Sequence, residues 1–309
     1  GVEISFVIRS DTRPVCLSRH DWVGKIIIIP EFIPLHEESD WLSKQAAFPS
    51  VDVLVLDGYQ FDSDYRESIS ELAPRFVLFD DTNDSGDLFA DVIINTTDEA
   101  RHLGYETTAP DADYCLGSNY RVLRREFSVL PHNEWRERHS LTIVMGGSDV
   151  KNLTISLLEA LDAASFENPV RVMTGAAYPY QEELGRFLGH TNLSVQHLPN
   201  CQQVAEVFCS SRLVVSAAGS SQFELLACST PAILLIVANN QIPATNDAVS
   251  QGWCTSLNIQ NEINIKALTR HIIELWQDNE RLKEMSAKAE RITTDSQSND
   301  DALLEIIFK

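Results

Sequence analysis

Residues 141–152 are LTIVMGGSDVKN, and residues 214–235 are VVSAAGSSQFELLACSTPAILL. Each stretch begins with a short apolar run, passes through glycine and serine, and continues with helical spacing. Strands that are buried on both faces of a parallel sheet have this uninterrupted apolar character. The two stretches therefore predict strand–turn–helix units of an α/β fold.

The same alternation extends through the rest of the chain. Expected strands cover residues 4–8, 25–29, 53–57, 76–79, 92–94, 141–145, 170–174, 193–197, 213–216 and 232–237. Expected helices cover residues 151–164, 222–228, 243–250, 262–291 and 302–308. This order predicts two doubly wound lobes, with a ligand cleft between them at the carboxyl ends of the strands.

A polar stretch at residues 131–140, PHNEWRERHS, interrupts the alternation before a new strand begins. The sequence therefore predicts an N-terminal lobe at residues 1–130, a linker at 131–140 and a C-terminal lobe at 141–290. Residues 291–309 are expected to form a helical tail.

Composition excludes several classes of function. The 309 residues include 45 acidic and 24 basic side chains, and this formal charge of −21 is wrong for a general nucleic-acid binder. No apolar run reaches the roughly 18–20 residues of a membrane span. The six cysteines are scattered, which suits a reducing, cytoplasmic compartment. No histidine or cysteine cluster has metal-ligand spacing, so neither a metal nor a cofactor is predicted.

Three turns after expected strands of the C-terminal lobe suggest a nucleotide site. Glycines let backbone amides approach a phosphate, and asparagine or glutamine amides suit sugar or phosphate oxygens. The Gly146-Gly147 turn alone is equally typical of helix capping, for which Ser148 and Asp149 are both candidates, and a lone asparagine turn is more often loop or capping chemistry. Glu224 alone could simply interact with the helix dipole. Three such turns at one sheet edge favour a ligand site. The predicted nucleotide-binding residues are Gly146, Gly147, Ser148, Gly219, Ser220, Glu224, Asn240 and Gln241.

The motifs MGGSD-x-KN, S-A-x-G-S-x-x-x-E-L and NNQ-x-P occur in this order. They resemble the C-terminal lobe of the UDP-sugar hydrolases of pseudaminic acid biosynthesis, which are relatives of GT-B glycosyltransferases. Residues 53–62 (VLVLDGYQFD), 79–95 (FDDTNDSGDLFADVIIN) and 117–127 (GSNYRVLRREF) resemble N-terminal stretches of the same family. The resemblance covers about residues 2–257 and implies two Rossmann-type lobes.

The resemblance also implies an activity, in which water attacks the anomeric carbon of UDP-2,4-diacetamido-2,4,6-trideoxy-β-L-altropyranose and releases UDP. The two glycine turns would meet the diphosphate and Glu224 the uridine ribose. Asn240 and Gln241 would contact the phosphates or the sugar, and Tyr59 would line the catalytic cleft.

The chain departs from this family at its start. The family opens with a strand, a G-x-G-H loop whose histidine is the proposed general base, and a helix. Here no G-x-G-H occurs, and the opening residues resemble the family's second strand. A first βα unit is therefore expected to be absent, with a partner or further segment covering the exposed edge. His20 is the best-placed substitute base.

Two other functions stay open on sequence grounds. A GT-B glycosyltransferase would use the same C-terminal lobe and transfer the sugar to an acceptor hydroxyl. A catalytically silent nucleotide-sugar-binding protein would explain the missing G-x-G-H.

Overall fold

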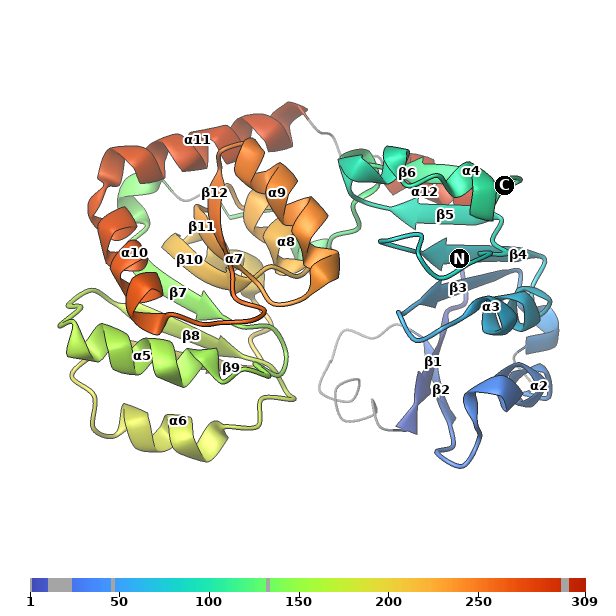
Figure 1. Ribbon diagram of the computed structural model, residues 1–309, viewed down its shortest axis with the longest axis horizontal. Coiled ribbons are helices and arrows are strands. Elements are labelled where there is room, and N and C mark those ends of the chain that lie inside the picture. The colour runs from blue at the N-terminus through green and yellow to red at the C-terminus, as the bar shows by residue number, and fades with distance from the viewer. Residues whose placement is uncertain (1, 11–23, 46–47, 132–133, 296–299) are drawn as a thin grey trace. The chain divides into compact units, whose positions relative to one another are not determined.

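The computed structural model describes residues 2–10, 24–45, 48–131, 134–295 and 300–309 (Figure 1). The chain forms two compact units, Gly1–Val122 with Gln297–Lys309, and Leu123–Ser296. The sequence predicted the boundary between the lobes at a linker of residues 131–140, whereas the boundary between the two units lies after Val122. The reason is apolar packing, because Phe127 is buried in the core of the second unit and Leu123 and Leu130 pack against it.

The second unit is built on a six-stranded parallel sheet in the order β12-β11-β10-β7-β8-β9. Its strands are β7 (Ser140–Val144), β8 (Val170–Thr174), β9 (Val195–Pro199), β10 (Ser211–Ala217), β11 (Ala232–Ile236) and β12 (Cys254–Asn258). The chain runs outward from β7 to β9, returns to β10 and then runs outward on the other side. This is the doubly wound order, with its switch point between β7 and β10.

Helices cover both faces of this sheet (Figure 1). Apolar side chains of α5 (Leu153–Ala163), α6 (Gln181–Leu188) and α10 (Ile265–Gln277) share one core with residues of the sheet. Those of α7 (Val204–Cys209), α8 (Ser221–Ala227) and α9 (Ile242–Ser250) share the other, while α11 (Asn279–Asp295) contributes Leu282 and Met285 to the first core and Ala289 to the second. Alternate side chains of each strand enter alternate cores, so Ile143 belongs to the first and Val144 to the second.

The first unit has parallel strands in two separate sheets. β1 (Ser5–Arg9) pairs with β2 (Lys25–Ile29), while β3 (Val53–Asp57), β4 (Arg75–Phe79), β5 (Val92–Asn95) and β6 (Asp113–Leu116) form a four-stranded sheet in chain order. The sequence predicted one doubly wound lobe with a single sheet here. Within the described residues, neither β1 nor β2 pairs with β3, so the unit has two sheets. The expectation that a partner or further segment covers this region stays a prediction.

Helices also cover both faces of the four-stranded sheet. One face packs against α2 (Glu38–Ser43) and α3 (Ser63–Ser70), and the short α4 (Tyr105–Thr108) also contributes to that core. The other face packs against α12 (Asp300–Ile307) through Leu303. The predicted tail at residues 291–309 is thus divided, because α11 extends to Asp295 in the second unit while α12 completes the first. Among the helices described, none is both long and apolar enough to cross a bilayer.

Candidate functional site

The carboxyl ends of β7 and β10 lie side by side in the second unit. Val144 is paired with Ser216 near the end of both strands, and Ala217 of β10 is paired with Leu235 of β11. The turns that follow these three strands therefore open at one edge of the sheet, beside the switch point. Open α/β sheets bind their ligands in this place.

The first turn exposes its backbone. Gly146 has a φ of +73°, and both Gly146 and Gly147 are exposed, with no atom within 4 Å of where a Cβ would stand. On the other side, a Cβ on Gly175 would lie 2.7 Å from the Cα of Gly147. The turn after β8 therefore packs against the backbone of the turn after β7. The space on the Cβ side of Gly146 and Gly147 stays open.

Asp149, rather than Ser148, caps the helix that follows. Its side chain is buried, and its two carboxylate oxygens accept hydrogen bonds from the backbone N–H groups of Leu153 and Thr154, each at 2.9 Å. Half-buried Ser148 remains in the turn, and its contact with a ligand stays a prediction.

The second turn, with Gly219 and Ser220, leads into α8, whose first turn contains Glu224. Glu224 accepts a hydrogen bond of 2.8 Å from the Nε of Arg124, which also pairs with Glu126 at 2.9 Å. Only 12% of the Glu224 side chain is exposed. The sequence did not predict the Arg124–Glu224 pair because the two residues are 100 positions apart. The pair fixes the orientation of a carboxylate predicted to meet a ribose.

The third turn is the 3-10 helix Asn239–Gln241. The side-chain oxygen of Gln241 accepts a 2.8 Å hydrogen bond from the backbone N–H of Val237, and its carbonyl accepts one from Thr245. Gln241 therefore shapes the turn, and half-buried Asn240 lies within it. All eight predicted nucleotide-binding residues belong to the three turns or to the first turn of α8.

The ammonium group of Lys151, near the first turn, is bound by two backbone carbonyls. The Nζ of Lys151 donates to the backbone carbonyls of Ile259 and Gln260, each at 2.7 Å. Lys151 thus ties the β7 turn to the segment after β12. That segment borders a polar cavity of about 400 Å³, lined by Asn258, Asn261, Glu262 and Asn264. The sequence singled out neither feature.

The first unit carries an acidic cluster at the carboxyl edge of its four-stranded sheet. Tyr59 is 70% exposed, and its hydroxyl donates to the carboxylate of Asp81. Burial raises the pKa of the Asp57 carboxyl, and the nearby charge of Asp81 raises it further. Asp80 is a structural residue, since it accepts hydrogen bonds from the backbone of Asn83 and the hydroxyl of Tyr105.

His20, the predicted substitute base, lies outside the described residues. Within those residues, no group of three or more histidine, cysteine, aspartate or glutamate side chains is arranged to hold a metal ion.

Comparisons with known proteins agree with this architecture. The chain is 27% identical over 216 residues to the uncharacterized protein MJ1062 of Methanocaldococcus jannaschii, covering 67% of this chain but only 45% of that protein. It is 24% identical over 199 residues to the UDP-2,4-diacetamido-2,4,6-trideoxy-beta-L-altropyranose hydrolase of Campylobacter jejuni, covering 63% and 70% of the two chains. The crystal structure of Acinetobacter baumannii MurG superposes with a TM-score of 0.65 at 16% identity, covering 99% of this chain and 91% of MurG.

The similarity to MurG establishes a GT-B-like α/β fold with parallel sheets. The family model of the glycosyltransferase family 28 C-terminal domain matches residues 141–301, which is just over half of the sequence and contains all three turns. The chain therefore belongs to the glycosyltransferase family 28 C-terminal domain family.

Proposed function

We propose that this protein binds a UDP-sugar on its second unit and hydrolyses it, releasing UDP from a 2,4-diacetamido-trideoxy sugar. The observation that carries the proposal is the placement of three glycine- or amide-rich turns at the switch point of a family 28 domain. The similarity to the Campylobacter jejuni hydrolase supports the choice of reaction and sugar. Such a reaction would belong to nonulosonic acid biosynthesis.

In the proposed mechanism, the backbone amides of the first two turns hold the diphosphate. Glu224, oriented by Arg124, accepts hydrogen bonds from the ribose hydroxyls. Asn240 and Gln241 contact the phosphates or the sugar. Charge develops on the diphosphate as the bond to the anomeric carbon breaks, and fixed amide dipoles stabilise that charge without reorganisation.

The attacking water needs a base, which typically contributes about 10²- to 10⁴-fold. We assign this role to His20 and place Tyr59 at the reacting sugar. The Asp57 carboxyl, with its raised pKa, is an alternative proton acceptor on the same unit as Tyr59.

A glycosyltransferase is the second candidate, because the matching family is itself one of glycosyltransferases. It would use the same UDP site, but an acceptor hydroxyl would replace water. The two reactions differ in whether UDP release requires an acceptor.

The test is calorimetric titration with UDP, followed by an assay of UDP release from its diacetamido-sugar conjugate without acceptor. Saturable binding with release is the expected result. Binding with release only after an acceptor is added would favour the transferase, and binding without any release would indicate a silent binding protein. Absence of UDP binding would refute the nucleotide site.

Glu224→Gln provides a sharper test of the ribose contact. We expect UDP to bind about 10- to 100-fold more weakly, because a hydrogen bond to a charged group contributes about 1.5–3 kcal/mol. Glu182→Gln is the matched control, since Glu182 is an exposed glutamate in the first turn of α6. Equal affinities of the two variants for UDP would show that Glu224 does not contact the nucleotide.

A further inference from the structure

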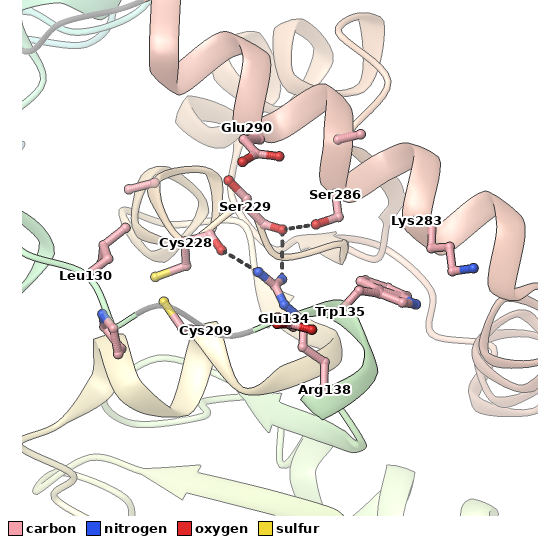
Figure 2. Close-up of a pocket in the computed structure, with 13 residues that line it drawn as sticks. Leu130, Glu134, Trp135, Arg138, Cys209, Cys228, Ser229, Lys283, Ser286 and Glu290 are labelled. Atoms are coloured by element: carbon pink, nitrogen blue, oxygen red, sulfur yellow. Dashed lines mark hydrogen bonds between the residues drawn. The ribbon is translucent and has the colours of Figure 1, made fainter.

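A second cavity lies at the opposite edge of the second unit's sheet. It has a volume of about 380 Å³, and the cysteines Cys209 and Cys228 both line it (Figure 2). Cys209 is the last residue of α7, and Cys228 directly follows α8. Both cysteines precede the strand that their helix leads into, so they lie near the amino ends of β10 and β11, away from the three turns.

The two thiols are neighbours. Figure 2 shows their sulfur atoms directed towards one another, and each thiol shifts the pKa of the other. The Sγ of Cys228 also lies 3.9 Å from the carbonyl oxygen of Ala205. The two residues are only 3% and 2% exposed, and both line the cavity.

Arg138 provides a fixed positive charge in the same cavity. Its guanidinium donates to the carbonyls of Ser229 at 2.9 Å and of Cys228 at 3.4 Å, and its buried Nε has no hydrogen-bond partner among the residues that the structure describes. The neighbouring Cys228 thiol lowers the pKa of the Cys209 thiol, and the charge of Arg138 lowers it further, although burial opposes both. A thiolate beside a second thiol and a cation is the arrangement of reactive cysteines.

We propose that Cys209 and Cys228 form a redox-active dithiol, which a small hydroperoxide converts into an intramolecular disulfide. The Cys209 thiolate attacks one oxygen of hydrogen peroxide, the O–O bond breaks, and hydroxide leaves and takes up a proton to become water. Cys209 is then a sulfenic acid. The Cys228 sulfur attacks the Cys209 sulfur, the S–O bond breaks, and the departing hydroxide takes the thiol proton. Two thiols and one peroxide thus give one disulfide and two waters.

The test uses the reduced full-length chain, treated with hydrogen peroxide, alkylated and digested without reductant. Mass spectrometry should find peptides containing Cys209 and Cys228 joined by a bond that dithiothreitol reverses. Cys228→Ser should stop the reaction at a Cys209 sulfenic acid that dimedone traps, and Cys209→Ser should give neither product. Cys254→Ser is the matched control, because Cys254 is equally buried but does not line the cavity, and it should leave the linkage intact.

Arg138 variants separate an electrostatic role from a structural one. Arg138→Gln should slow sulfenic acid formation about tenfold, because loss of the positive charge raises the pKa of the Cys209 thiol and lowers its thiolate fraction. Arg138→Lys should restore much of the rate by keeping the charge. The wild-type digest decides the proposal even if a variant fails to fold. Failure to link Cys209 to Cys228, or equally fast oxidation of Cys254, would overturn it.

Discussion

Gly175 shows how one missing side chain positions the turn after β7. Any Cβ at this residue would stand 2.7 Å from both the Cα and the carbonyl oxygen of Gly147. Gly175→Ala should therefore push the turn after β7 outward, lower the free energy of unfolding by about 1–3 kcal/mol and weaken UDP binding. Calorimetry with and without UDP measures both effects.

Gly185→Ala is the matched control for that change. Gly185 lies inside α6, and a Cβ there would meet nothing within 4 Å. The alanine should raise stability by up to about 1 kcal/mol, because glycine is the poorer helix former. Equal effects of the two alanines would contradict the packing argument at Gly175.

Asp149 caps α5 with both of its carboxylate oxygens. It has a φ of +43°, a conformation that aspartate and asparagine tolerate better than alanine. Asp149→Ala should lower the free energy of unfolding by about 2–3 kcal/mol, through the lost cap and the added backbone strain. Asp149→Asn keeps the tolerated backbone and one acceptor oxygen, so its loss should be smaller. Denaturant titration measures both, and a harmless alanine would show that another residue caps the helix.

At the scale of elements, one face of the helix α12 packs against the four-stranded sheet and the other face is exposed. Leu303 is 7% exposed and packs on Val77, Val92 and Ile94 of the four-stranded sheet, whereas neighbouring Leu304 is 52% exposed. Leu303→Ala should lower the stability of the first unit by about 2–4 kcal/mol, as expected for a buried leucine. Leu304→Ala should change it by less than about 0.5 kcal/mol. Similar losses in the thermal unfolding of the two variants would mean that α12 does not pack as described.

Strands with strong apolar character were predictable from the sequence, whereas two polar edge strands were not. β11 was expected because its five residues, AILLI, are an uninterrupted apolar run, and all five are buried in the structure. β12 (CTSLN) lies at the sheet edge, where threonine and serine are tolerated, and it was not predicted; β6 (DYCL) was missed for the same reason. The turns followed from their strands, but Arg124 did not, because only the folded chain brings it to Glu224.

For the whole molecule, two compact units suggest two unfolding transitions. UDP at about 100 times its dissociation constant should stabilise the second unit by about 2.7 kcal/mol. Leu303→Ala should move only the transition of the first unit. Differential scanning calorimetry of both samples makes the comparison, and a single transition shifted by both changes would contradict independent unfolding.

The first unit is discontinuous in sequence, and this has a consequence during synthesis. The ribosome makes β4 and β5 early, but the helix that covers Val77 and Ile94 comes only after the entire second unit. At ~5–20 residues per second, the nascent sheet waits roughly 10–35 s with that apolar face uncovered. The second unit, although later in the chain, is complete first. A chaperone that recognises apolar strands therefore has its main opportunity on the N-terminal half, in the interval before α12 is translated.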